Sequence, residues 1–219
     1  MTLRYSLTSP PEVVAEAFGL HTIDPFPPRI AVAPTEPVGI VRRTLRGSRE
    51  LHLVRWGLIP SWMKDPARKA ALFTARAETV ADKPSFRGGL RHRRCLVPAD
   101  SFYAWSGETG RRTCHQFRAR SGRPMALAGI ADHWLGADGS ELETMALLTV
   151  AANAVVASVT DRMPVILAPG DYDRWLDCRS GEAVSVLELL EPAPDHLLEG
   201  LAAGPLPRAR MKGSPNEDA

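Results

Sequence analysis

The beginning of the chain carries one clear helical pattern. Residues 9–19 read "SPPEVVAEAFG", in which a Ser precedes two prolines and apolar positions recur at helical spacing before a Gly. A capping hydroxyl, prolines in the first turn and a closing Gly are typical of a helix. The pattern therefore predicts a helix capped by Ser9 and ended by Gly19.

From residue 38 onward, short apolar runs alternate with turn-rich pieces. A β-hairpin is predicted where "GSRE" separates "VGIVRRTLR" from "LHLVRWGL". Further strands are predicted at "RRCLVPA", "SFYAWS", "TCHQFRAR", "PMALAGIADHW", "TMALLTVAA" and "DRMPVILA". A second helical region is predicted from "PGDYDRWLD" through "GEAVSVLELL". Together these elements predict an α+β fold: one domain over 1–203 with a largely antiparallel, barrel-like central sheet and peripheral helices, and a flexible tail over 204–219.

Composition narrows the class of protein. The 219 residues are 44% hydrophobic and 24% charged, which is typical of a soluble globular chain. No apolar run approaches the roughly 18–20 residues of a membrane helix, and residues 1–20 show no secretory signal. The cysteines are odd in number and widely spaced: Cys95, Cys114 and Cys178. We therefore expect a cytoplasmic monomer without disulfides.

Neither a metal nor a cofactor is expected. The cysteines contain no CxxC pair, and His92, His115 and His133 show no metal-ligand spacing. We interpret these histidines as ordinary surface or core residues. Asp100, directly after "VPA", is interpreted as a turn residue.

The net charge of +2 hides a marked asymmetry along the chain. Residues 29–123 contain 20 Lys or Arg and only 7 Asp or Glu. Such an excess favours a partner with many phosphates, because neutralising phosphates releases condensed counterions. Arg is also abundant overall, with 23 Arg against 4 Lys, so the excess alone does not decide between DNA binding and a compositional bias.

Six short stretches are more specific than a fold requires. They are "RIAVAPTE" (29–36), "RWGLIPSW" (55–62), "TARAET" (74–79), "RRCLVPADSFYAW" (93–105), "LTVAANAVV" (148–156) and "DRMPVIL" (161–167). In order and spacing they resemble the SOS response-associated peptidase family, whose members are also described as abasic site processing proteins. The resemblance extends from Arg4 to about Trp175.

This resemblance implies a particular chemistry. Family members bind single-stranded DNA and react with the ring-opened aldehyde of an abasic site. Removal of Met exposes an N-terminal Cys, whose amine attacks the aldehyde and whose thiol closes a thiazolidine, so that a DNA–protein crosslink shields the lesion. An Asn, a Glu and a His manage proton transfer and substrate placement. The same Cys is credited with cleaving off the first Met.

The chain departs from the family at all four catalytic positions. The family opens with Met-Cys-Gly-Arg and an aromatic residue, whereas this chain opens with "MTLRY". The positions of the catalytic Cys, Asn, Glu and His hold Thr2, Thr74, Ala104 and Thr160. A further family Asn is Ala31. Because none of these side chains titrates near neutral pH, we predict that covalent capture has been lost.

Positions that bind DNA in the family are kept. They hold Arg4, Trp56, Trp62, Arg76, Glu78 and Arg162. The resemblance implies that the arginines contact phosphates and that the aromatic–Pro wall of "WGLIPSW" packs on bases, as guanidinium and indole groups can do. The same residue types have structural explanations, since a Trp is often a core residue and an Arg–Glu pair can be structural.

Three hypotheses follow, of which we favour the first. In the first, the protein binds single-stranded or abasic DNA without covalent capture. In the second, the α-amine of Thr2 supports weak crosslinking, lyase or autopeptidase activity. In the third, the protein is an interaction scaffold without DNA binding. Basic residues gathered in one groove with Arg76 and Arg162 favour the first hypothesis, and scattered ones favour the third.

Overall fold

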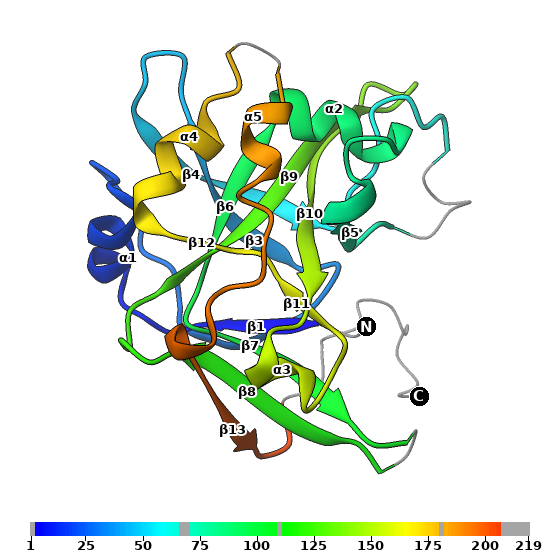
Figure 1. Cartoon of the computed structure of the whole chain (residues 1–219). Helices are drawn as coiled ribbons and strands as arrows, with labels where there is room; N and C mark the ends of the chain where they lie inside the picture. The colour runs from blue at the N-terminus through cyan, green and yellow to red at the C-terminus, as the bar shows by residue number, and fades with distance from the viewer. Residues whose placement is uncertain (1–2, 66–70, 109–110, 180–181, 207–219) are drawn as a thin grey trace, which may run out of the picture.

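Strands occupy the centre of the molecule, and short helices lie around them (Figure 1). The computed structural model describes residues 3–65, 71–108, 111–179 and 182–206. The strands are β1 (Arg4–Leu7), β2 (Arg29–Val32), β3 (Pro37–Arg43), β4 (Arg49–Trp56), β5 (Thr74–Arg76), β6 (Arg94–Ala99), β7 (Ser101–Ser106), β8 (Thr113–Ala119), β9 (Met125–Leu135), β10 (Glu141–Ala151), β11 (Arg162–Pro164), β12 (Ile166–Leu167) and β13 (Leu198–Ala203). The helices are α1 (Pro11–Phe18), α2 (Pro84–His92), α3 (Ala154–Ala157), α4 (Tyr172–Leu176) and α5 (Val184–Leu187), with 3-10 turns η2 (Ala77–Thr79), η3 (Pro169–Asp171) and η4 (Asp195–Leu197).

Five strands close into a barrel. The ring runs β10–β4–β3–β6–β9 and returns to β10. Most of its pairings are antiparallel, whereas β10 runs parallel to β4 and also to β5. The predicted hairpin is confirmed as β3 and β4. The segment predicted as one strand, "DRMPVILA", is divided, because β11 pairs with β10 and β12 pairs with β9.

A second, antiparallel sheet lies below the barrel in Figure 1, in the order β13–β8–β7–β1–β2. Its inner face is aromatic: the rings of Phe102 and Phe117 are stacked with centroids 5.2 Å apart. Tyr5 of β1 reaches the barrel, where its ring centroid lies 5.5 Å from that of Trp56. One hydrophobic core therefore joins both sheets, as expected for a single α+β domain with a barrel-like centre.

The first predicted helix is confirmed, but its predicted cap is wrong. Gly19 ends α1 in the left-handed region, at φ 64°. The N-cap is Pro10, and the Ser9 hydroxyl instead donates to Asp100 Oδ1 at 2.6 Å. Asp100 Oδ2 also accepts from the Ser9 backbone N–H at 2.8 Å, so this carboxylate anchors the segment that leads into α1.

The later helical region is shorter than predicted. It divides into η3, α4 and α5, and helix α2 was not predicted. Two adjacent glycines, Gly88 and Gly89, weaken the helical pattern of α2.

The remaining predictions about the chain concern its end, its thiols and its relation to membranes. The predicted tail lies, from residue 207 on, outside the described residues. The three cysteines are free thiols. Within the described ranges no helix is long and apolar enough to cross a membrane.

Candidate nucleic-acid interface

Arg76 and Arg162 lie on the two sides of the C-terminal half of β10. On one side β5 runs parallel to β10 and places Arg76 opposite Thr149. On the other side β11 runs antiparallel and places Arg162 opposite Ala151. Two segments separated by more than 80 residues in the sequence are therefore held beside one strand.

Arg162 is fixed by a bidentate ion pair with Glu78. Its Nη1 and Nη2 donate to the two carboxylate oxygens at 2.6 and 2.9 Å, and Nη2 also donates to the Thr149 carbonyl at 2.6 Å. These hydrogen bonds hold the pKa of Glu78 below its usual range, with a smaller contribution from the charge of Arg76. Arg162 is largely buried and committed to Glu78, whereas Arg76 is exposed.

Glu78 was predicted as a DNA-binding residue, and its geometry indicates an indirect role. A carboxylate repels a phosphate, but this one holds the guanidinium of Arg162 in a single orientation. We therefore assign Glu78 to positioning. The cluster that Arg76, Glu78 and Arg162 form is called the β10 cluster below.

Two contacts connect the β10 cluster to the first strand of the chain. Tyr5 of β1 packs against Trp56, and the Trp56 indole Nε1 donates to the Phe73 carbonyl at 2.9 Å. Phe73 immediately precedes Thr74, the first residue of β5. Thr74 lies opposite Leu147 of β10, and Thr160 comes two residues before Arg162, the first residue of β11.

The position that the resemblance assigns to the family's Glu is filled. Ala104 is 1% exposed and Leu3 is 2% exposed, both within the core. The register pairs Arg4 with Tyr103 and Tyr5 with Phe102; extended by one residue, it brings Leu3 opposite Ala104 on the same face. A large apolar side chain therefore fills this place. Thr2 lies outside the described residues.

One residue beside Ala104 was not singled out by its sequence pattern. The pairing of β7 with β8 places His115 directly opposite Ala104, so both side chains share one face. The His115 Nε2 atom lies 2.9 Å from the Ser106 hydroxyl. His115 was interpreted as an ordinary surface or core residue, because a cross-strand register cannot be read from its isolated position in the sequence.

The two tryptophans of the predicted DNA-contacting set differ. Trp56 is 0% exposed, and an indole without exposed surface cannot stack on a base. Trp56 is therefore a core residue, which corrects that prediction. Trp62 is 56% exposed and is accessible to a ligand.

Arg4 lies on the face of β1 opposite to Tyr5. Its guanidinium carbon is 5.9 Å from the centroid of the Trp105 ring, within the range of a cation–π contact. The structure thus joins Arg4 to an aromatic side chain of β7.

The sequence of the chain matches a known protein family. Residues 1–205 match the family described as SOS response associated peptidase (SRAP). The chain belongs to the SRAP family.

Curated relatives in the SRAP family support the same assignment. The chain is 31% identical over 216 residues to the abasic site processing protein YoqW of Bacillus subtilis, covering 97% of this chain and 96% of that protein. It is 32% identical over 193 residues to the abasic site processing protein YoaM of the same organism, covering 86% and 85%.

Solved structures share the SRAP-like fold of this chain. A protein from Bacteroides thetaiotaomicron has a TM-score of 0.82 at 24% identity, with 91% of this chain and 90% of that chain covered. A protein from Bordetella bronchiseptica has a TM-score of 0.80 at 25% identity, with 93% and 100% covered.

Ion pairs among the described residues neutralise part of the basic stretch of this SRAP chain. Ion pairs join Arg29 to Glu36, Arg42 to Glu143, Arg49 to Asp173, Arg93 to Asp132, Arg118 to Glu199 and Arg123 to Glu16. Arg94 is buried and donates to backbone carbonyls. Six arginines of the stretch are exposed and form no ion pair with a described residue: Arg46, Arg76, Arg87, Arg91, Arg111 and Arg112. The basic stretch is therefore partly structural and partly available to a ligand.

The described part of the SRAP chain contains no group of three or more His, Cys, Asp or Glu residues that could hold a metal ion. The candidate interface consists of arginines and the exposed Trp62.

Proposed function

We propose that this SRAP protein binds single-stranded DNA, including DNA with abasic sites, without forming a covalent bond. The observation that carries the proposal is the contrast within one region. The β10 cluster keeps a fixed Arg162 and an exposed Arg76. The positions that the resemblance assigns to the catalytic Asn, Glu and His hold Thr74, Ala104 and Thr160, which offer no acid or base near neutral pH.

Physical chemistry supports binding without catalysis. A preoriented guanidinium group contributes positive potential to a phosphate site, while an exposed one forks directly onto phosphate oxygens. General acid–base groups each contribute roughly 10²–10⁴-fold to a rate, so the loss of several leaves little chemistry. The protein can therefore keep DNA binding while it loses covalent capture of the abasic site.

A gel experiment tests the proposal. The protein is mixed with a single-stranded oligonucleotide that carries one abasic site, and native and denaturing gels are run with and without borohydride. We expect a shifted native band, weakened by Arg76→Ala, and no band that survives denaturation. Arg123→Ala is the matched control, since it removes one exposed charge beside α1. Absence of any native shift would support the scaffold hypothesis instead.

A second candidate function is slow imine chemistry at Thr2, and His115 is the observation that favours it. Its imidazole shares a face with the position where the family has its Glu. An imidazole there could take a proton from the α-ammonium group, freeing the amine to attack the aldehyde, and return a proton to the departing hydroxide. Borohydride would then trap a band that disappears in His115→Ala and on blocking the N-terminus.

A further inference from the structure

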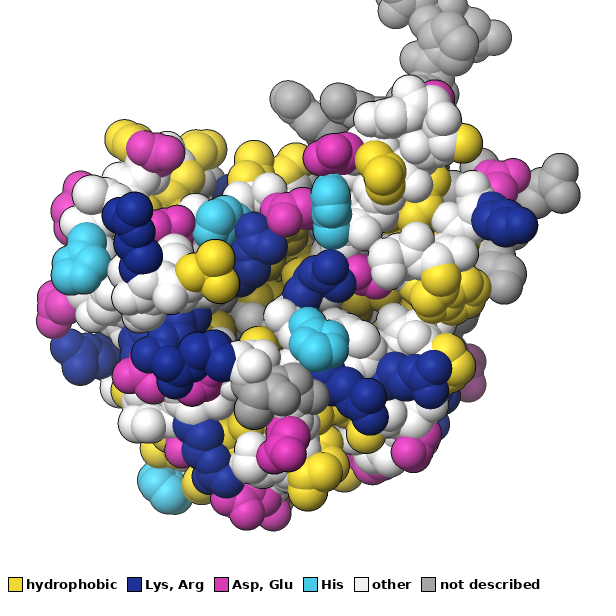
Figure 2. All heavy atoms as spheres, turned by 90° about the horizontal axis from the view of Figure 1, so that it is seen from above, with side chains coloured by type: hydrophobic (Ala, Val, Ile, Leu, Met, Phe, Trp, Pro, Cys, Tyr) yellow, Lys and Arg dark blue, Asp and Glu magenta, His cyan; other side chains and the backbone are white. Residues whose placement is uncertain are grey.

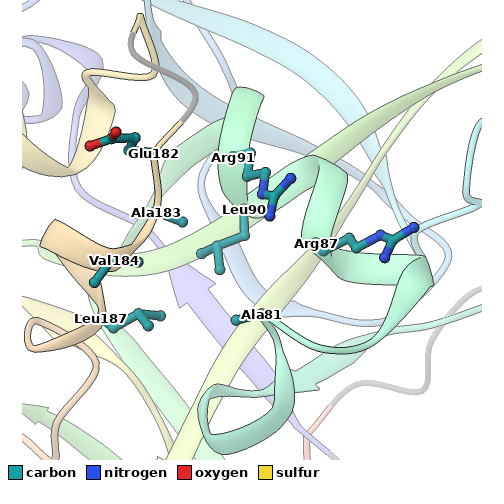
Figure 3. Close-up of a pocket in the computed structure, with 8 residues that line it drawn as sticks. All are labelled: Ala81, Arg87, Leu90, Arg91, Glu182, Ala183, Val184 and Leu187. Atoms are coloured by element: carbon teal, nitrogen blue, oxygen red, sulfur yellow. The ribbon is translucent and has the colours of Figure 1, made fainter.

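A hollow opens between α2 and α5, which lie on the face of the molecule that Figure 2 shows. Its volume is about 490 Å³, within the range of about 300–1,000 Å³ that is typical of ligand sites. Half of its lining is apolar and buried or half-buried: Ala81 and Leu90 on the α2 side, and Ala183 and Leu187 on the α5 side. In Figure 3 the Leu90 side chain is directed toward α5. This part of the lining suits an apolar group of a ligand.

One apolar side chain at the rim of this hollow is open to solvent. Val184, the first residue of α5, is 81% exposed. Single exposed apolar residues are ordinary on protein surfaces, but Val184 lines the same hollow as the half-buried Leu187 and extends its apolar lining outward. A ligand that covered both side chains would remove their apolar surface from water, which is favourable.

The α2 wall of the hollow is basic. Arg87 and Arg91 are four residues apart in α2, so they lie on one face of the helix. Both are exposed, and neither forms an ion pair with a described residue. The carboxylate of Glu188, just after α5, is paired instead with Arg174 at 2.6 Å. The two cations therefore keep their charge for a ligand with acidic groups.

The rest of the lining favours a peptide over a nucleic acid. The same arginines also border a hollow on the Trp62 side of α2, so their charge alone does not identify the ligand of either hollow. Single-strand binding sites combine a basic groove with aromatic side chains on which bases stack, and none of the eight residues that line the α2–α5 hollow is aromatic. Glu182 lies on the wall opposite Arg87 (Figure 3), where its charge would repel a continuous phosphate backbone. A short peptide with acidic groups on one side only avoids that repulsion.

We propose that the α2–α5 hollow binds an acidic peptide segment of a partner protein. The segment inserts one large apolar side chain against Val184 and Leu187, and its carboxylates pair with Arg87 and Arg91. Arginine clusters recognise acidic motifs in this way, and an apolar anchor in a desolvated pocket carries much of the binding energy of protein interfaces. This interaction goes beyond the proposed DNA binding and does not depend on it.

Fluorescence anisotropy with synthetic peptides tests the proposal. The probe is a short labelled peptide in which one Phe is flanked on both sides by Asp, and we expect the wild-type protein to bind it. Replacing the Phe by Ala should weaken binding about 10- to 150-fold, the loss of one buried aromatic side chain. Replacing the Asp residues by Lys should abolish binding. The proposal is wrong if the wild type does not bind the probe, or binds all three peptides equally.

Substitutions on the two walls place the peptide in the hollow. Arg87→Ala/Arg91→Ala should weaken binding of the probe about 2- to 30-fold, the effect of two exposed ion pairs, and the difference should shrink at high salt. Ala81→Phe should weaken binding because the new ring occupies the hollow. Val184→Asp should also weaken it, because a negative charge then faces the peptide; Val184 is 81% exposed, so this variant should fold. Wild-type affinity in all three variants would overturn the proposal.

The matched control is Arg111→Ala/Arg112→Ala, which removes two exposed charges directly before β8, in the lower sheet of Figure 1. It should bind the probe as the wild type does, and an equal loss there would reduce the effect to net charge and overturn the site. Displacement of the probe by a single-stranded oligonucleotide, whose own affinity also falls in Ala81→Phe, would assign the hollow to nucleic acid. Dimerisation of the wild type that Val184→Asp abolishes, measured by analytical ultracentrifugation, would assign it to a second copy of the chain. Either result would overturn the proposal.

Discussion

The filled position beside Ala104 yields a prediction about how the side chains that the family resemblance implies could be introduced. Ala104→Glu returns the family's Glu, but it introduces a carboxyl into a place that Leu3 fills. Leu3→Gly returns the family's Gly and removes that side chain. We expect the two substitutions to be coupled, so that the pair costs less stability than the sum of the single variants.

The magnitudes follow from burial. Leu3 is 2% exposed, so its truncation should cost about 2–5 kcal/mol for the cavity and about 0.5–1 kcal/mol for the added freedom of glycine. At Ala104, extra methylenes in a packed core cost about 1–3 kcal/mol, and an unpaired carboxyl costs about 1–3 kcal/mol more. In the pair, the new side chain occupies the cavity, and a coupling of about 0.5–3 kcal/mol is expected.

Urea denaturation, monitored by Trp fluorescence, measures the free energy of unfolding of the wild type, the two single variants and the pair. Ala183, a buried alanine at the start of α5, supplies the control: Ala183→Glu combined with Leu3→Gly should be additive. Because burial raises the pKa of a carboxyl, Ala104→Glu alone should lose stability as pH rises above about 4.3. Additivity of Leu3→Gly and Ala104→Glu within about 0.5 kcal/mol would refute the shared space. Crosslinking should likewise require Leu3→Gly in a variant that carries Thr2→Cys, Thr74→Asn, Ala104→Glu and Thr160→His. Equal crosslinking without Leu3→Gly would contradict the inference that Leu3 fills the space beside residue 104.

The remaining predictions concern residues that hold the interface in place. Trp56→Ala should lower the free energy of unfolding by about 3–5 kcal/mol in urea, because it empties a fully buried site; a change below 1 kcal/mol would contradict its assignment to the core. Arg94→Met should cost about 3 kcal/mol or more in the same assay, since the carbonyls of Leu90 and Trp175 lose their donor. Arg162→Lys keeps the charge but loses the bidentate pair with Glu78, so single-strand affinity should fall, and wild-type affinity would show that a point charge suffices. The pKa of Glu78 is lowered from 4.5 in the folded state, so its contribution to stability is fully present above pH 4.5 and is lost as pH falls through the lower folded value. Acid unfolding of Glu78→Gln should therefore depend less steeply on pH than that of the wild type below pH 4.5, and identical profiles would exclude this contribution.

Local sequence patterns were sufficient to predict elements whose structure depends on a few neighbouring residues. The helix ended by Gly19 and the hairpin of β3 and β4 were predicted because a left-handed glycine and an alternating apolar pattern act over few residues. The cap of α1 was predicted wrongly because the Ser9 hydroxyl bonds with Asp100, which lies 91 residues away in the sequence. A rule based on neighbouring residues cannot predict this hydrogen bond between distant parts of the sequence.

The same distinction applies to the site. The identities at positions 2, 74, 104 and 160 could be read from the sequence, since matching a family motif requires only order and spacing. Burial of Trp56 could not, because the "WGLIPSW" motif does not say which indole faces the core. Commitment of Arg162 to Glu78 also depends on strands on opposite sides of β10.

By itself, the sequence determined the fold class, the family and the identities of the side chains at positions 2, 74, 104 and 160. These properties depend on residue type and on short-range periodicity, both of which can be read directly from the order of the residues. The tertiary structure alone decided which arginines are neutralised, that Leu3 fills the place beside Ala104, and that Trp62 faces α2. Those outcomes are set by pairing register and by packing between distant segments, where a shift of one residue would turn a side chain to the opposite face.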